Sequence, residues 1–205
     1  MKILCFSDLH RDREAAARLV QVANDPEQAI DMVIGAGDFA NRRVGAADTL
    51  DLLAAIELPA ILVPGNGESA DELRQAAACW RSAEVLHGNG AQHLDVPIYG
   101  LGGGIPVTPF GDWSYDFDEE TAETMLADCP PHGILVVHSP PIDTVDHDSA
   151  GKIRGSQAIR DCVLAKKPKL VVCGHIHSDW GKQVTLGESV IVNAGPAGVI
   201  VSIET

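Results

Sequence analysis

The sequence predicts an α/β fold with a largely parallel sheet, on the evidence of two patterns. Short apolar runs alternate along the 205 residues with segments whose apolar residues recur at i, i+3, i+4 and i+7, the spacing of an amphipathic helix. Strands and helices that alternate in this way form right-handed βαβ units. The hydrophobic fraction of 45% and the charged fraction of 21% suit a chain that buries a sizeable core. We therefore expect residues 1–205 to form a single domain.

Three strand–helix units account for the first half of the chain. The strands are expected at residues 3–6, 32–34 and 61–63, which are wholly apolar. The helices that follow them have these apolar stripes: Ala16, Leu19, Val20 and Ala23; Ala46, Leu50, Leu53 and Ala54; Leu73, Ala76, Ala77 and Trp80. Pro59 is expected to end the second helix, and Ser69 with Glu72 has the S-x-x-E spacing of a capping box at the start of the third.

The middle of the chain is less regular. Short strands are expected at residues 85–87 and 98–100, on either side of a turn at residues 88–90. Residues 102–117 are rich in glycine, proline and aromatic side chains and are expected to form a long loop.

The last third returns to strand–helix alternation and ends in short strands. The expected elements are a helix marked by Ala122, Met125, Leu126 and Cys129, a strand at 134–137, a loop at 139–155, a helix capped by Ser156 that buries Ile159, Cys162 and Val163, and a strand at 170–173. Three apolar runs between residues 183 and 203 are then typical of an antiparallel meander.

The composition bears on partners and location. Fifteen basic and 29 acidic residues give a formal net charge of −14, a field that repels nucleic acid and anionic membranes and attracts cations. No apolar run approaches the length that spans a bilayer, and Ser7 and Asp8 follow the first strand too early for a signal peptide. Five scattered cysteines favour reduced, mostly buried thiols. We therefore expect a cytoplasmic protein, with its oligomeric state left open.

Five of the expected strands are followed by side chains that could bind a metal ion. The carboxyl ends of parallel strands meet at one edge of a sheet, and residues at i and i+2 of extended backbone face the same way. We therefore expect seven side chains to converge there: Asp8, His10, Asp38, Asn66, His138, His175 and His177.

Seven ligands suit two ions about 3.5–4 Å apart better than one. All of them offer oxygen or nitrogen and none a thiolate, which indicates manganese, iron, nickel or zinc. Manganese is the metal we expect first. One ligand must bridge the ions, and a carboxylate can do so with both oxygens, so Asp38 is the expected bridge. Two divalent ions, Asp8, Asp38 and one hydroxide leave a single positive charge, which a phosphodiester monoanion would neutralise.

These motifs resemble the calcineurin-like metallophosphoesterase superfamily. The resemblance lies in Asp8-Leu9-His10, Gly37-Asp38, Gly65-Asn66, His138 and Gly174-His175-Ile176-His177, and it covers essentially the whole chain. His138-Ser139-Pro140-Pro141 and Asn193-Ala194-Gly195-Pro196 further look like the small Icc-related phosphoesterases. The resemblance implies a four-layer α/β/β/α sandwich.

The resemblance also implies roles for the seven residues. Asp8, His10, Asp38 and His177 would hold the first ion, and Asp38, Asn66, His138 and His175 the second. The reaction would be in-line attack of a metal-activated hydroxide on a phosphoester, with Asp38, Asn66 and His138 in the catalytic set. A small phosphodiester, such as a nucleotide or cyclic nucleotide, is the expected substrate.

One position departs from the family pattern. The family usually carries Gly-Asn-His followed by Asp or Glu, whereas this chain has Gly65-Asn66-Gly67-Glu68. A positioned acid is typically worth about 10²–10⁴-fold in rate, and Gly67 cannot supply one. Three alternatives stay open: a leaving group that needs no acid, a substitute such as His147 or a held water, or a metal-binding scaffold or interaction module with little turnover. A nuclease is less well supported because of the acidic charge.

Other polar and aromatic residues are assigned to structure rather than chemistry. We expect His87, His93 and His132 to be surface or turn histidines. Trp113, Tyr115 and Phe117 are expected either to pack over the sheet or to form an apolar wall for an aromatic leaving group.

Overall fold

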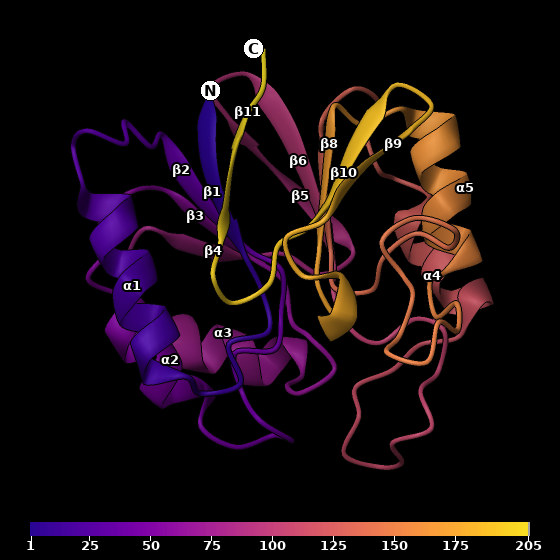
Figure 1. Ribbon diagram of the computed structural model, residues 1–205, viewed down its shortest axis with the longest axis horizontal. Coiled ribbons are helices and arrows are strands. Elements are labelled where there is room, and N and C mark those ends of the chain that lie inside the picture. The colour runs from indigo at the N-terminus through magenta and orange to yellow at the C-terminus, as the bar shows by residue number, and fades with distance from the viewer. Residues whose placement is uncertain (205) are drawn as a thin grey trace.

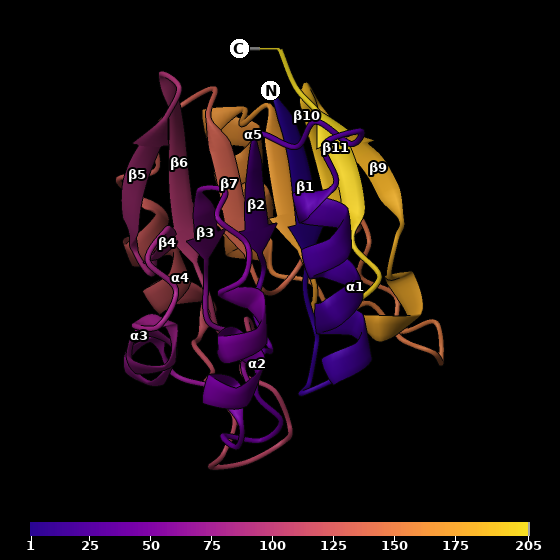
Figure 2. The same cartoon turned by 90° about the vertical axis from the view of Figure 1, so that its left-hand side faces the viewer.

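The computed structural model describes residues 1–204, which form two mixed sheets packed face to face with helices outside both (Figure 1). The first sheet has the strand order β11-β1-β2-β3-β4, and its central strands are parallel. Its strands are β1 (Lys2–Phe6), β2 (Met32–Gly35), β3 (Ala60–Leu62), β4 (Ala83–Val85) and β11 (Val199–Ser202). Its outer face is covered by α1 (Arg13–Asn24), α2 (Ala46–Leu53) and α3 (Ala70–Ala77), which lie in front of it in Figure 2.

The second sheet has the strand order β5-β6-β7-β8-β10-β9. Its strands are β5 (Asn89–His93), β6 (Val96–Leu101), β7 (Ile134–Val137), β8 (Leu170–Cys173), β9 (Gln183–Leu186) and β10 (Ser189–Asn193). Helices α4 (Glu119–Leu126) and α5 (Gln157–Lys166) cover its outer face, and a short 3₁₀ helix, η1 (His177–Asp179), follows β8. The four-layer α/β/β/α sandwich is thereby confirmed.

The alternation of side chains along each strand explains why the strands are apolar throughout. In β1, Leu4 and Phe6 pack against the helices, whereas Ile3 and Cys5 pack between the sheets. The inter-sheet core also contains Met32 and Ile34 from the first sheet, together with Ile134, Val136, Leu170 and Val172 from the second. A strand buried on both faces requires an unbroken apolar run rather than an alternating one.

The predicted helix caps are confirmed. The Ser69 hydroxyl accepts a hydrogen bond from the Glu72 N–H (3.3 Å), and the Glu72 carboxylate accepts one from the Ser69 N–H (2.7 Å). The Ser156 hydroxyl accepts from the Ile159 N–H at the start of α5. Each cap satisfies a backbone donor that the first turn of the helix leaves unpaired.

Several predictions of local structure were wrong. The expected turn at residues 88–90 instead leads into strand β5, whose polar sequence pairs with β6 at the sheet edge. The carboxyl-terminal tail is not a meander: β10 pairs in parallel with β8, and β11 crosses to the other sheet to pair with β1.

The ends of two helices also differ from the prediction. Helix α2 ends at Leu53, before Pro59, and Trp80 is buried beyond the end of α3. The prediction of mostly buried thiols is confirmed, since four of the five cysteines are buried and Cys79 is exposed.

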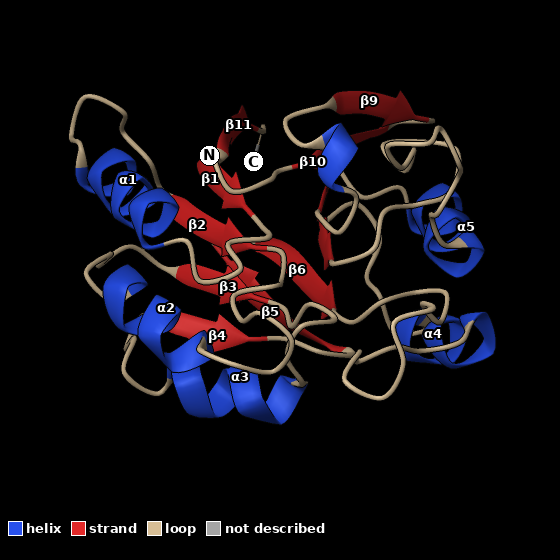
Figure 3. Cartoon of the chain, turned by 60° about the horizontal axis from the view of Figure 1, so that its bottom comes forward, coloured by secondary structure: helices blue, strands red, loops and turns tan. Residues whose placement is uncertain are grey.

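The parallel strands direct their carboxyl ends to one end of the sandwich. Strands β1, β2 and β3 run in parallel within one sheet, and β7 and β8 do so within the other. Figure 3 brings this end forward and shows loops from both halves meeting between the two helical layers. Among residues 1–204, none of the helices combines the length and the apolar content needed to cross a bilayer.

Candidate metal centre

The loops after β1 and β2 continue to pair beyond the sheet, and this brings the first two carboxylates together. The Asp8 N–H donates to the Gly37 carbonyl (2.9 Å), and the His10 N–H donates to the Asp38 carbonyl (2.9 Å). Asp8 and Asp38 are both buried in consequence. Ligand atoms of Asp8, Asp38 and His138 lie within 4.8 Å of one another, and buried carboxylates are costly unless positive charge or hydrogen bonds compensate them.

Four of the seven predicted ligand residues occupy the left-handed backbone region. The φ angles are 54° at Asp8, 44° at His10, 58° at Asp38 and 67° at His175. This conformation costs a non-glycine residue roughly 1–2 kcal/mol. Such residues persist where the surrounding structure holds them, and they gather at functional sites.

Glycines before the candidate ligands are required by close packing. A Cβ on Gly65 would overlap the carboxylate of Asp38, and a Cβ on Gly174 would press on the carboxylate of Asp8 and the hydroxyl of Ser7. The Gly-Asn and Gly-His pairs of the sequence therefore have a steric reason in addition to their resemblance to a motif.

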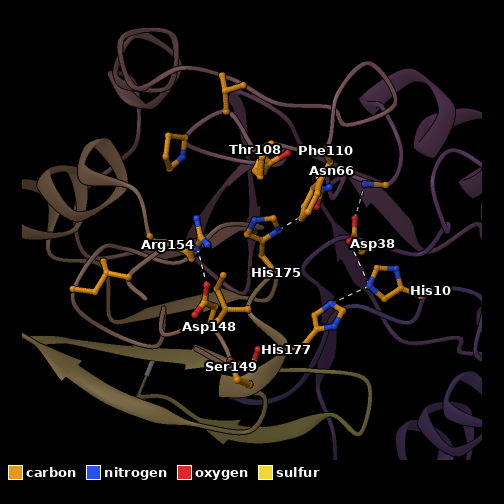
Figure 4. A pocket seen from close by; sticks show the side chains of 18 of the residues that line it. His10, Asp38, Asn66, Thr108, Phe110, Asp148, Ser149, Arg154, His175 and His177 are labelled. Carbon is orange, nitrogen blue, oxygen red and sulfur yellow. Dashed lines mark hydrogen bonds and ion pairs between the residues drawn. The ribbon is translucent and has the colours of Figure 1, made fainter. Parts of the chain in front are cut away.

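One group of side chains forms around Asp8, His10, Asp38 and His177. The Nε2 atoms of His10 and His177 lie 3.2 Å apart, and the His177 Nε2 lies 3.8 Å from Asp8 Oδ1. The His10 Nε2 lies 3.6 Å from Asp38 Oδ2. Figure 4 shows the two imidazoles and Asp38 facing one another at the edge of a cavity.

A second group forms around Asn66, His138, His175 and the other oxygen of Asp38. The Asn66 Oδ1 lies 3.2 Å from His138 Nε2 and 3.1 Å from His175 Nδ1, and these two nitrogens are 3.2 Å apart. The His138 Nε2 lies 3.6 Å from Asp38 Oδ1. The structure thus brings all seven predicted residues together, with Asp38 between the two groups.

Backbone contacts orient the imidazoles. The His138 ring places Nδ1 2.8 Å from the Ala36 carbonyl, and the His10 ring places Nδ1 3.3 Å from the Ala40 carbonyl. If each Nδ1–H donates to its carbonyl, each Nε2 presents a lone pair toward the carboxylates. This is the arrangement by which proteins fix the tautomer of metal-binding histidines.

Asp8 is held by groups from the carboxyl-terminal part of the chain as well as by its neighbour. Its Oδ2 accepts hydrogen bonds from the Ser7 hydroxyl (2.6 Å) and the Trp180 indole N–H (3.1 Å), and the His175 N–H donates to the same carboxylate. Sequence reasoning gave no role to Ser7, although it is adjacent to Asp8, and missed Trp180, which is 172 residues away along the chain.

The charges of the site shift the pKa values of its members in opposite directions. Burial would raise the pKa of Asp38, but His138, His10 and the Gly67 N–H hold it well below its usual range. Burial would lower the pKa of His138, but the charges of Asp38 and Asp8 raise it to about 9. Burial and the neighbouring His138 lower the pKa of His175 to about 3. Shifts of the pKa in both directions are expected where carboxylates and imidazoles lie close together in a buried site.

Glu68 is a functional candidate to which sequence reasoning gave no role. Its buried carboxylate accepts hydrogen bonds from the N–H groups of Asp38 (2.9 Å), Ala40 (2.8 Å) and Gly65 (2.8 Å). Burial and the charge of Asp38 raise its pKa to about 7. The one sequence signal for it is its place two residues after Asn66.

A cavity of about 880 Å³ opens beside the seven residues. One wall contains His10, Asp38, Asn66, His175 and His177. Two loops supply much of the remaining lining. The first is largely apolar, with Pro106, Val107, Pro109, Phe110 and Trp113, whereas the second contributes Ile142 and Ile153 together with the charged Asp148 and Arg154. The volume falls in the range of sites that bind small organic molecules.

The residues weighed as aids to catalysis are placed differently. Trp113 lines the cavity, but Tyr115 and Phe117 instead pack around His87, with ring centroids 5.5 and 5.3 Å from it. His87 is therefore half-buried rather than a surface residue. His147 does not belong to the described cavity lining, and its ring lies 3.6 Å from Asp146.

Comparisons with known proteins agree with the architecture. Residues 1–179 match the family model described as calcineurin-like phosphoesterase. A search of the curated proteins found no match.

Solved structures share the fold at low sequence identity. The protein TT1561 of Thermus thermophilus has a TM-score of 0.76 at 22% identity, over 96% of this chain and 90% of that one. Phosphopantetheinyl hydrolase (PptH) from Mycobacterium tuberculosis has a TM-score of 0.62 at 15% identity, over 95% and 88%. A protein described as a novel archaeal phosphodiesterase has a TM-score of 0.53 at 14% identity, over 95% and 84%.

Proposed function

The chain belongs to the calcineurin-like phosphoesterase family, and on that premise we propose that it is a dinuclear metal-dependent phosphoesterase that hydrolyses a small phosphodiester. The observation that carries the proposal is the position of Asp38. Its Oδ2 faces His10 and its Oδ1 faces His138, so that one carboxylate addresses both groups of side chains. A bridging carboxylate between two sets of nitrogen and oxygen donors is typical of two-metal hydrolases.

The donor set fits two divalent ions. We assign Asp8, His10, Asp38 and His177 to the first ion and Asp38, Asn66, His138 and His175 to the second. Manganese, iron, nickel or zinc would suit this set, because every donor is oxygen or nitrogen, and we propose manganese as the first to test. When bound, the ions would supply a hydroxide at neutral pH and neutralise charge on the phosphoryl oxygens.

The protein itself holds the catalytic set Asp38, Asn66 and His138 in fixed orientations. The Asn66 side-chain amide donates to the Ser114 hydroxyl (2.9 Å), and this hydroxyl donates to Asp116 (2.8 Å). That chain of hydrogen bonds turns the amide oxygen of Asn66 toward the two imidazoles. Because these groups are buried and already oriented, little reorganisation is needed when substrate binds.

The cavity supports a substrate with an apolar or aromatic group. The rings of Phe110 and Trp113 stack with centroids 5.5 Å apart and an interplanar angle of 14°. They form a flat surface against which a nucleobase or another ring can pack. Two proteins with this fold are named a phosphodiesterase and a phosphopantetheinyl hydrolase, which supports the phosphoester class. We therefore propose a nucleotide or cyclic nucleotide as a natural candidate.

The proposal extends to the domain organisation, the location and the partners of the protein. We propose that residues 1–205 act as one domain and that the protein is cytoplasmic, because its five thiols are free. Its net charge of −14 disfavours nucleic acid and anionic membranes as partners.

Hydrolysis of bis(p-nitrophenyl) phosphate tests the proposal. p-Nitrophenolate leaves without protonation, so the absence of an acid at Gly67 does not mask the activity. We expect manganese-dependent hydrolysis in the wild type, its loss in Asp38→Asn, and wild-type rates in the control Asp71→Asn, whose side chain is 95% exposed. Equal rates in Asp38→Asn, or full activity after complete metal removal, would refute the proposal.

Gly67 favours a second candidate, a metal-binding interaction module with little turnover. The exposed apolar side chains Val44, Val107 and Phe110 would then belong to a docking surface. Metal binding without turnover of any activated ester would support this candidate over the enzyme.

A further inference from the structure

Trp180 contacts two of the residues that we assign to the first ion. It comes directly after the short helix η1, whose first residue is His177. Its indole N–H donates to Asp8 Oδ2 (3.1 Å). Its ring lies against the imidazole of His177, with centroids 4.3 Å apart and an interplanar angle of 30°. One side chain thus links a ligand that follows β1 to a ligand that follows β8.

The indole of Trp180 is itself held by the loop after β10. A Cβ on Gly195 would lie 2.7 Å from both Cβ and Cγ of Trp180, so this side chain packs directly on the backbone of Gly195. The same glycine exchanges two hydrogen bonds with Ser7: its N–H donates to the Ser7 hydroxyl (2.9 Å), and its carbonyl accepts from the Ser7 N–H (3.1 Å). Gly195 therefore fixes two of the residues that donate to Asp8.

The donors around Asp8 leave its two carboxylate oxygens unequal. Oδ2 accepts from the Ser7 hydroxyl (2.6 Å), the Trp180 indole (3.1 Å) and the His175 backbone N–H (3.1 Å). A carboxylate oxygen has about two lone-pair sites, so three donors occupy it fully. Oδ1 lies 3.8 Å from His177 Nε2 and is the oxygen left to face the proposed first ion.

The imidazole of His177 lacks the support that two other imidazoles of the site have. The rings of His10 and His138 each place Nδ1 near a backbone carbonyl, at 3.3 and 2.8 Å. Within residues 1–204, the His177 ring has no such carbonyl, and its hydrogen-bonding contact is with the His10 ring at 3.2 Å. Its side chain is also 52% exposed. The stacked indole of Trp180 is therefore the main restraint on the orientation of this imidazole.

We propose that Trp180 is a positioning residue for the first ion, whose indole N–H fixes Asp8 and whose ring face fixes His177. The inference rests on the two-ion site of the proposed function. An indole N–H is a donor only, so Trp180 acts through these two ligands and binds no metal itself. Asn66 and His138, which we assign to the second ion, are held by Ser114 and by the Ala36 carbonyl instead. Loss of the indole should therefore weaken the first ion and leave the second in place.

The variants Trp180→Phe and Trp180→Leu separate the two contacts. Phenylalanine keeps a ring face for His177 but removes the N–H, whereas leucine removes both. The control is Leu164→Ala, because Leu164 is also a partly exposed apolar residue, at 45% against 37% for Trp180. We expect the metal-free Trp180→Phe protein to melt within about 2–4 °C of the wild type, the shift that about 1 kcal/mol causes in a chain of this size.

Calorimetric titration of the metal-free proteins with manganese measures the effect on each ion. We expect Trp180→Phe to weaken one ion about tenfold and Trp180→Leu to weaken the same ion about 100-fold, the range found when a residue that supports a metal ligand is lost. The affinity of the other ion should stay within about twofold of the wild type, as should both affinities in Leu164→Ala.

Anomalous scattering from Trp180→Leu crystals at limiting manganese identifies the weakened ion. The peak among Asn66, His138 and His175 should remain, and the peak beside His10 and His177 should fade. Equal loss of both peaks would show that Trp180 supports the fold and not one ion, and would overturn the inference.

Hydrolysis of bis(p-nitrophenyl) phosphate separates this inference from the proposed function. We expect Trp180→Leu to be slow at limiting manganese and to return to within about threefold of the wild-type rate at saturating manganese, because excess metal refills a weakened site. An inactive wild type whose variants lose one ion selectively would support Trp180 and overturn the enzymatic proposal. An active wild type, with both Trp180 variants equal to Leu164→Ala in manganese affinity, would overturn the role of Trp180 alone. A wild type that binds no pair of ions would overturn both.

Discussion

At the residue scale, Glu68 connects the loops that carry Asp38 and Asn66. Three backbone N–H groups from two loops donate to its two carboxylate oxygens at 2.8–2.9 Å. The residue is almost completely buried. A carboxylate that accepts several buried N–H groups replaces the water these groups lose on folding.

Replacing Glu68 with glutamine should destabilise the protein. The amide oxygen can accept from Asp38 and Gly65, but the NH₂ group then faces the N–H of Ala40 and leaves that donor unpaired. We expect a loss of about 1–3 kcal/mol in the free energy of unfolding, measured by urea titration, together with weaker manganese binding. The exposed control Asp71→Asn should change neither value. A Glu68→Gln protein as stable as the control would show that these hydrogen bonds do not matter.

His87 should make stability depend on pH. Burial and the nearby Arg74 lower its pKa to about 4, with Asp71 opposing the shift. Its Nδ1 accepts from the Gly102 N–H (3.3 Å), and its Nε2 lies 3.2 Å from the Tyr115 hydroxyl. The unfolded chain, with a histidine pKa near 6.5, binds more protons between pH 6.5 and 4. The contribution of His87 to the free energy of unfolding is therefore fully present above pH 6.5, and it is lost as the pH is lowered toward 4.

The variant His87→Gln isolates that contribution. Urea titrations at pH 7 and pH 4 should show a drop in stability about 1–2 kcal/mol smaller in the variant than in the wild type, after allowance for partial solvent exposure of the ring. An identical drop in both proteins would show that His87 is not responsible.

The seven candidate ligands could be predicted from the sequence because each follows its strand directly. Their placement depends on local order along the chain, as in Asp8-Leu9-His10 and Gly174-His175-Ile176-His177. Glu68 and Trp180 could not be assigned roles, because their contacts depend on how distant loops pack against one another.

At the element scale, β11 ties the carboxyl-terminal part of the chain to the first sheet. It pairs with β1 in antiparallel register, with Val201 opposite Ile3 and Ile200 opposite Leu4. Val201 is buried between the sheets, whereas Ile200 is 36% exposed. Neighbouring residues of one strand thus face different environments.

Two substitutions in β11 test this register. Val201→Ala should lower the free energy of unfolding by about 1–3 kcal/mol because it removes buried methyl groups. Ile200→Ala, one residue away, should cost about 0.5 kcal/mol or less. Urea titration of both variants provides the measurement. A larger cost for Ile200→Ala would reverse the assignment of the two faces.

Elements with apolar periodicity could be predicted, and those without it could not. The strands that become β1, β2, β7 and β8 are continuous apolar runs, because they are buried on both faces. Strand β5 has the sequence Asn-Gly-Ala-Gln-His and lies at a sheet edge, where pairing with β6 rather than burial defines it. The crossing of β11 depends on which sheet has a free edge, and periodicity carries no such information.

At the scale of the whole molecule, the sandwich unites ligands from two separate sheets. Asp8, Asp38 and Asn66 follow strands of the first sheet, whereas His138 and His175 follow strands of the second. Packing of the sheets through their shared core brings the two sets to the same cavity. The site thus depends on the folded sandwich and not on either sheet alone.

Anomalous scattering from crystals grown with manganese tests the two-ion site most directly. We expect two peaks about 3.5–4 Å apart, with the carboxylate of Asp38 between them. Asp8, His10 and His177 should surround one peak, and Asn66, His138 and His175 the other. Crystals without a peak among these residues, or with a single peak that does not touch Asp38, would show that the chain holds no such pair of ions.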